Sequence, residues 1–144
     1  MQLRRDVLPA LQKKGAKLVC VSIGTPERAK DFVAETGFPS EFLFADPENA
    51  CYDALRLHKG LARTFLAVST PFSIKDRIEK DGAEDLREIL PRWKPWLPPK
   101  ADQGLQQGGT FVFKGREAVL AHYDESTGAH ADFQTVLRAA GCAE

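Results

Sequence analysis

Apolar positions along the chain alternate between helical spacing and short continuous runs, a pattern that predicts an α/β fold. The runs KLVCVSI and EFLFAD are typical of strands in a parallel sheet, and the first is apolar enough to be buried on both faces. Apolar residues recur every three or four positions around them, which indicates helices. The expected order is helix 3–14, strand 17–23, helix 26–36, strand 41–46, helix 47–57, hairpin 110–123 and helix 131–140.

Residues with known positional preferences mark the ends of these predicted helices. Thr25 can cap the second helix, Pro26 suits its first position, and Gly37 can close it in a left-handed conformation. Asp46 followed by proline repeats this start for the third helix. The turn at Thr25 has a single glycine before it and no phosphate-binding lysine, so we interpret it as a helix cap rather than a nucleotide site.

Between 61 and 107 the periodicity loosens into two short helix-like segments and a proline-rich stretch that contains Trp93 and Trp96. The segment has too few apolar residues for a core of its own, so we expect an insertion within one domain, 1–144. The two tryptophans either pack over the sheet or anchor a partner protein.

Composition narrows the function without assigning it. Twenty basic residues balance twenty acidic ones, so no net charge draws the protein toward nucleic acid or an anionic membrane. No apolar run is long enough to cross a membrane, and the N-terminus lacks the apolar core of a secretory signal. We find no cofactor motif and expect no cofactor. Cysteines without a disulfide or zinc spacing indicate an intracellular, reducing compartment.

The three cysteines differ in their expected surroundings. Cys20 lies inside a predicted strand, where burial would raise its pKa and suppress its reactivity. Cys51 lies about one turn into the third helix, and Cys142 lies near the C-terminus. Either of these two could be exposed, and both remain candidate reactive thiols, although neither has the basic neighbour that stabilises a thiolate.

The stretch AHYDESTGAHADF places His122, Asp124 and His130 close together in the sequence. The residue types suit a metal or acid–base site, but eight residues separate the histidines, unlike the i and i+4 ligands of a metal-binding helix. A strand end, a turn at Gly128 and a helix start explain the stretch better. A metal-dependent hydrolase built on these three residues remains the weaker alternative.

Several segments resemble successive motifs of the peroxiredoxin-like 2 family of AhpC/TSA-type, thioredoxin-like proteins, most of all its plant and algal members. They are AKLVCVSIGTPERAKDFVAETGFP, FLFADPENACYDALRL, ARTF, LQQGGTFVFKG and AHYDESTGAHADF. The resemblance implies a thioredoxin-like α/β fold, thiol-dependent redox or antioxidant chemistry, a thiol reductant or thiol-containing protein as partner, and the chloroplast or cytoplasm as location.

The resemblance also implies a CxxC-type motif after the first core strand, and this motif is missing. Met1 falls inside what resembles the family's first helix, so we expect an N-terminally truncated fold, inactive as a peroxidase in this form. The missing strand would lie between 17–23 and 110–113. We therefore expect these two strands to pair directly, or the chain to be a fragment of a longer product completed by an upstream segment or a partner strand.

The last inference from the resemblance concerns a pocket. Thioredoxin-like folds usually carry a cis-proline before the hairpin, and the matching residues here are Gly108, Gly109 and Thr110. Because glycine lets a bound thiol approach the backbone closely, we expect these residues to form a pocket wall, with Thr25 and Pro26 at the same end of the sheet. The alternative function is a non-catalytic binding module that uses the tryptophan- and proline-rich insertion.

Overall fold

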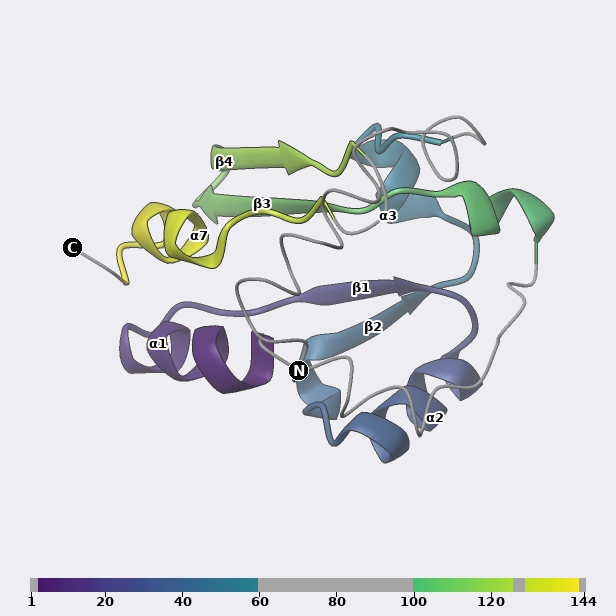
Figure 1. The fold of residues 1–144 in the computed structure, drawn as a ribbon, viewed down its shortest axis with the longest axis horizontal. Coiled ribbons are helices and arrows are strands. Elements are labelled where there is room, and N and C mark those ends of the chain that lie inside the picture. Colours follow the sequence, from purple (N-terminus) through teal and green to yellow (C-terminus); the bar gives the residue numbers. More distant parts are fainter. Residues whose placement is uncertain (1–2, 60–99, 126–128, 143–144) are drawn as a thin grey trace.

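The computed structural model describes residues 3–59, 100–125 and 129–142, and Figure 1 shows their arrangement. The greater part of the expected insertion, with Trp93 and Trp96, lies outside the described residues. No helix in the described ranges is both long and apolar enough to span a membrane.

The N-terminal helix has two parts. A π-helical segment, η1 (Leu3–Val7), leads into α1 (Leu8–Lys13). Pro9 lies in the first turn of α1, where its missing N–H breaks no helical hydrogen bond. Gly15 has φ +71° and ends the helix as predicted, because glycine adopts this left-handed conformation without steric cost.

The first sheet contains β1 (Cys20–Ile23) and β2 (Leu43–Asp46), which pair in parallel with Cys20 opposite Leu43. The helix α2 (Pro26–Thr36) connects them, with Thr25 as its N-cap and Gly37 in the left-handed C-cap position, as predicted. A 3₁₀ turn, η2 (Ser40–Phe42), precedes β2. Both strands are shorter than predicted. The prediction that 17–23 is buried on both faces was wrong, because β1 is only half-buried and Val19 is 62% exposed.

The predicted helix 47–57 was also wrong in its start and length. Pro47 and Glu48 form a turn, and α3 extends only over Ala50–Ala54. Asn49 precedes it with φ +62°, a conformation incompatible with a helix that begins at Pro47. After the undescribed residues, a 3₁₀ helix, η3 (Ala101–Leu105), leads toward the hairpin.

The C-terminal part confirms the predicted hairpin and helix. Strands β3 (Gly109–Lys114) and β4 (Glu117–Tyr123) pair antiparallel, with a register shift between Val112 and Phe113. Helix α7 (Phe133–Ala139) follows, and the Asp132 carboxylate caps it by accepting a 2.9 Å hydrogen bond from the Thr135 backbone N–H. It begins two residues later than predicted because Asp132 is extended.

The four described strands form two separate two-stranded sheets, β1–β2 and β3–β4. Figure 1 shows β1 and β3 on facing sides of the two sheets, running in opposite directions. The expected direct pairing of 17–23 with 110–113 was therefore wrong. A pair of strands that do not bond to each other leaves backbone groups on each edge that another partner must satisfy.

The best-buried apolar cluster joins the two ends of the chain. Val7 and Leu11 of the N-terminal helix pack with Leu137 of α7. Figure 1 shows α1 and α7 next to each other at the same end of the molecule, beside the two sheets. This cluster packs the N-terminal helix against the C-terminal helix.

Candidate functional site

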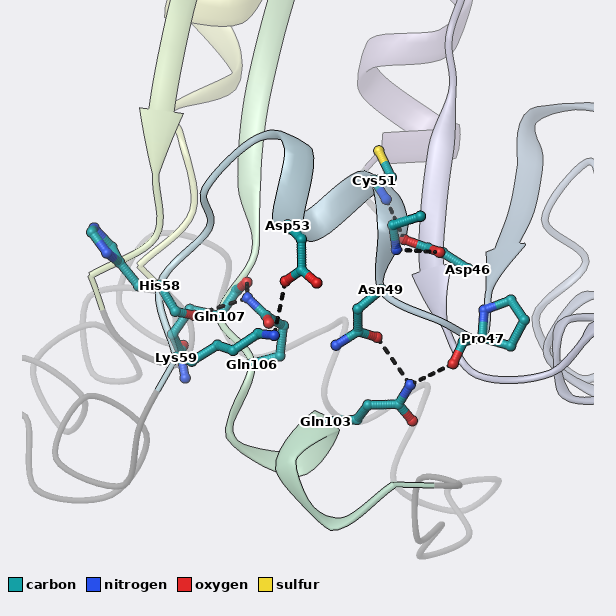
Figure 2. Close-up of polar contacts among 11 residues, drawn as sticks. Asp46, Pro47, Asn49, Cys51, Asp53, His58, Lys59, Gln103, Gln106 and Gln107 are labelled. Atoms are coloured by element: carbon teal, nitrogen blue, oxygen red, sulfur yellow. Dashed lines mark hydrogen bonds and ion pairs between the residues drawn. The ribbon is translucent and has the colours of Figure 1, made fainter.

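Helix α3 and the turn before it are organised by the carboxylate of Asp46. The two carboxylate oxygens accept hydrogen bonds from the backbone N–H groups of Ala50 (2.9 Å) and Cys51 (2.8 Å), as Figure 2 shows. A buried negative charge at the first turn of a helix satisfies donors that have no partner within the helix. Asp46 thus caps α3 from four residues upstream, rather than starting a helix at Pro47.

This geometry determines the character of the Cys51 thiol. Burial raises its pKa, and the negative charge of Asp46 raises the pKa further. A helix N-terminus ordinarily stabilises a thiolate, but here a carboxylate already occupies the N-terminal donors. Cys51 lies at the second residue of α3, not one turn into it as predicted, and is half-buried.

A set of glutamines fastens α3 to the segment that enters β3. Gln103 is 3% exposed, and its amide nitrogen donates to the Pro47 carbonyl (2.8 Å) and to Asn49 Oδ1 (2.9 Å) (Figure 2). Gln106 Nε2 and the Gln107 backbone N–H both donate to the carbonyl of His58, at 2.9 and 2.8 Å. These contacts fix the position of Gly108 and the start of β3 relative to α3.

Tyr52 on α3 reaches across to the first sheet. Its hydroxyl donates a 2.9 Å hydrogen bond to the backbone carbonyl of Val21 in β1. Burial raises the pKa of Tyr52, a hydrogen bond with the backbone of Ile23 lowers it, and the charge of Asp46 raises it. Backbone groups two residues apart on a strand face the same side, so the hydroxyl lies on the side of β1 that faces away from β2.

The other two cysteines lie in different places. Cys20 lines an apolar pocket of about 260 Å³ together with Phe32, Phe38 and Leu43, and burial raises its pKa, as predicted. Cys142 packs against the Val7 cluster, and its thiol lies 3.6 Å from the Ala140 carbonyl oxygen. Cys142 is half-buried, in the same burial class as Cys51.

The two glycines expected to line a pocket lie against backbone and side-chain atoms of the chain itself. A Cβ on Gly108 would lie 2.9 Å from Asp124 Oδ2. A Cβ on Gly109 would lie 2.8 Å from the His122 carbonyl oxygen and 2.9 Å from a methyl group of Leu57. A side chain at either position would therefore force these neighbouring atoms to shift. Thr110 pairs with His122 in the hairpin register, whereas the Thr25 hydroxyl accepts from the Arg28 backbone N–H at the start of α2.

The structure brings His122, Asp124 and His130 together. Asp124 is 4% exposed, and its Oδ2 lies 2.8 Å from His130 Nδ1. Its Oδ1 is buried without a hydrogen bond, and His122 Nε2 lies 3.5 Å away. His122 Nε2 also lies 2.9 Å from the Ala129 carbonyl oxygen. The predicted strand end and helix start are confirmed, and the side chains nevertheless converge.

The same three residues were also candidate ligands of a metal ion. The described ranges contain no group of three His, Cys, Asp or Glu residues arranged to hold a metal ion. His122 and His130 flank one carboxylate and are held by it and by a backbone carbonyl. In the described residues the two rings and the carboxylate thus form a hydrogen-bonded cluster around Asp124.

Comparison with known proteins identifies the family. The family model described as AhpC/TSA antioxidant enzyme matches residues 2–126. The chain belongs to this AhpC/TSA family. Its fold is accordingly thioredoxin-like, as the sequence predicted, and the family's description supports a redox-type function in general.

A curated relative of this AhpC/TSA chain is "Thioredoxin-like protein AAED1, chloroplastic" of Arabidopsis thaliana. The two are 32% identical over 111 residues, which make up 76% of this chain and 40% of the relative. The chain thus spans well under half the length of that relative. No solved structure matches the chain.

Sequence reasoning missed the residues that position the site. Gln103 and Asn49 are buried polar residues with each other as partners, and their separation of 54 positions hides the pairing from any local pattern. The QQGG motif carried a signal, since Gln106 and Gln107 turned out to be anchors before the hairpin. Asp124 was noticed as part of a possible metal or acid–base site, although a strand end and a turn were favoured there.

Proposed function

We propose that this AhpC/TSA chain is the thioredoxin-like scaffold of a protein in thiol-dependent antioxidant or redox chemistry, and that it does not turn over peroxide in this form. The surroundings of the cysteines carry the proposal. Burial disfavours the thiolate of Cys20, and burial with the Asp46 charge disfavours that of Cys51. An effective peroxide-reducing thiol needs the opposite environment, because the thiolate is the nucleophile.

A turnover assay tests this proposal. The purified chain, supplied with dithiothreitol, is assayed for hydrogen peroxide consumption and for reduction of insulin disulfides. We expect rates equal to those of dithiothreitol alone. Robust turnover that is abolished by Cys51→Ser or Cys142→Ser would overturn the proposal, and Cys20→Ser serves as the matched control for loss of a buried thiol.

The partner we propose is a thiol reductant or a thiol-containing protein, docking at Gly108, Gly109 and Thr110, with Thr25 and Pro26 at the far side of the same surface. The hydrogen bonds of Gln106 and Gln107 to the His58 carbonyl, directly before Gly108, support this location, since a binding backbone must be preorganised. A peptide that carries a thiol, titrated into the chain, should change the NMR chemical shifts of the backbone amides at 109–111 in β3. Changes confined to α7 would exclude this surface.

We further propose that an additional strand, from an upstream segment of a longer product or from a partner, pairs between β1 and β3. In this structure the Tyr52 hydroxyl donates a hydrogen bond to the Val21 carbonyl on the edge of β1, where the backbone of a neighbouring strand would bond. Hydrogen exchange in a longer, N-terminally extended product should be slower at the Val21 amide, which faces the same edge, and unchanged at Ser22, which faces β2. Equal exchange at Val21 in both products would rule the strand out.

Two observations support the chloroplast or the cytoplasm as the compartment. The relative's printed name includes the word chloroplastic, and cysteines without a disulfide spacing suit a reducing compartment. We expect a fluorescent fusion of the full gene product to localise to one of these two. Accumulation in the secretory pathway would contradict the proposal.

A further inference from the structure

The Asp124 carboxylate fixes the orientation and the proton position of His130. Their Oδ2 to Nδ1 distance is 2.8 Å, and an ionised carboxylate can only accept a hydrogen bond. Nδ1 therefore carries the proton, and in the neutral ring Nε2 has the lone pair. Because Asp124 is buried, solvent does not compete for this hydrogen bond.

The two histidines on this carboxylate are not equivalent. His130 has a side chain that is 58% exposed, and its Nε2 has no partner among the described residues. The Nε2 of His122 is engaged with the Ala129 carbonyl, so that ring is donating rather than basic at this atom. Holding Ala129 to the end of β4 positions the next residue, His130. One ring is thus a reachable base and the other keeps it in place.

The reachable imidazole stands beside the start of β3. The Asp124 backbone N–H donates a 3.1 Å hydrogen bond to the Gly108 carbonyl. A Cβ on Gly108 would lie 2.9 Å from the same Oδ2 that His130 Nδ1 contacts. Gly108 and the His130 ring therefore flank one oxygen atom, which places the base next to the surface proposed for thiol docking.

The second oxygen of the carboxylate lies near the other ring of the cluster. Asp124 Oδ1 is buried and accepts no hydrogen bond in the described structure, and His122 Nε2 lies 3.5 Å from it. The buried carboxylate therefore has one ring beside each of its oxygens. Tyr52, whose pKa is raised mainly by burial and in part by Asp124, is the other titratable group that senses this charge.

From these contacts we propose that His130, oriented by Asp124, takes the proton from a thiol that docks at Gly108–Thr110. The S–H bond breaks, the proton moves to Nε2, and the electron pair stays on sulfur as a thiolate. The imidazolium so formed keeps its Nδ1–H on Asp124. The reverse transfer protonates a departing thiolate. The step needs no oxidant or reductant, and it rests on the proposed thiol-docking function.

The test uses glutathione as the probe thiol and iodoacetamide as the trap. The full chain carrying Cys20→Ser, Cys51→Ser and Cys142→Ser removes its own thiols from the reaction. At pH 6.5 only about 1% of an ordinary thiol is ionised, so a base has room to accelerate alkylation. We expect about a tenfold increase over glutathione alone, saturating as glutathione is raised.

Single substitutions in that background locate the effect. His130→Gln should abolish the acceleration, and Asp124→Asn should reduce it strongly. Lys30→Gln, which changes an exposed titratable side chain on α2, should leave it intact, and circular dichroism checks that each variant folds. No acceleration in the parent, or equal losses in Lys30→Gln and His130→Gln, would overturn the proposal.

Nitrogen-15 NMR of the histidine rings gives a readout independent of any thiol. We expect His130 protonated at Nδ1 in the parent and a mixture of tautomers in Asp124→Asn. Protonation at Nε2 in the parent would overturn the assignment of the base. If glutathione is activated through His130 while every longer product fails in peroxide and insulin assays, the redox function falls and the acid–base pair stands.

Discussion

The thiols of Cys20 and Cys51 are partly buried in the folded chain, which disfavours their thiolate forms. Burial raises both pKa values, and the Asp46 charge adds to the effect at Cys51. We expect monobromobimane to label both residues more slowly at pH 8 in the folded chain than in the chain unfolded in guanidinium. Labelling should then rise as pH increases beyond 9. Mass spectrometry of the labelled peptides measures this, and equal folded and unfolded rates would contradict it.

The same shifts affect stability in a defined direction. The folded chain keeps its thiol protons to higher pH than the unfolded chain, so it binds more protons above the ordinary thiol pKa. The free energy of unfolding should therefore fall as pH rises through that value toward the folded pKa. Urea titrations at pH 7.5 and 9.5 measure the loss. A double variant, Cys20→Ser with Cys51→Ser, should lose less stability over this interval.

Tyr52 has a role that phenylalanine cannot fill. Its hydroxyl is the donor to the Val21 carbonyl on the edge of β1. Tyr52→Phe should destabilise the chain by about 1–2 kcal/mol, because a half-buried acceptor loses its partner. Tyr123→Phe alters the same functional group where the structure shows only ring contacts, so it should change stability little. Urea unfolding that ranks the two in the opposite order would exclude this role.

At the scale of elements, Asp46 and Gln103 decide where α3 lies. Asp46→Asn removes the charge at the α3 N-terminus and should cost about 1 kcal/mol of stability. It should also speed the labelling of Cys51, since the negative charge that disfavours its thiolate is gone. Glu48→Gln, which alters an exposed ion pair with Lys100, is the matched control. Unchanged Cys51 labelling in Asp46→Asn would refute the electrostatic cause.

The side chain of Gln103 should contribute more to the free energy of unfolding than the side chain of an exposed glutamine. Truncation by Gln103→Ala leaves the Pro47 carbonyl and Asn49 Oδ1 without their donor, at a cost of about 1–3 kcal/mol. Gln134→Ala on the exposed side of α7 should be nearly neutral. Equal midpoints of urea unfolding for the two variants would show that Gln103 does not fasten α3.

At the scale of the whole molecule, the two sheets depend on the cluster that joins α1 and α7. Leu137 packs there with Val7 and Leu11, and it is among the few apolar residues that are well buried in the described ranges. Leu137→Ala should cost about 2–5 kcal/mol, which approaches the whole stability of a small domain. Val119→Ala, at an exposed strand position, is the control. Thermal unfolding followed by circular dichroism separates the two outcomes.

How far sequence reasoning reached depended on how local each feature is. The Thr25 cap, the Gly37 end and the hairpin were predictable because a few neighbouring residues specify each of them. The start of α3 was not, since Asp46 caps it across an intervening left-handed Asn49. The full burial expected of β1 failed because periodicity reports what a strand can bury, not which neighbours are present.

The sequence by itself determined the element order, the two ends of α2 and the AhpC/TSA membership, all of which reside in contiguous residues. Only the tertiary structure decided that the strands form two separate sheets and that Gln103 meets Asn49. It alone showed that the buried Asp124 carboxylate hydrogen-bonds His130 beside Gly108. Such contacts join residues distant in the chain, and their energies depend on burial and orientation, which a linear pattern does not contain.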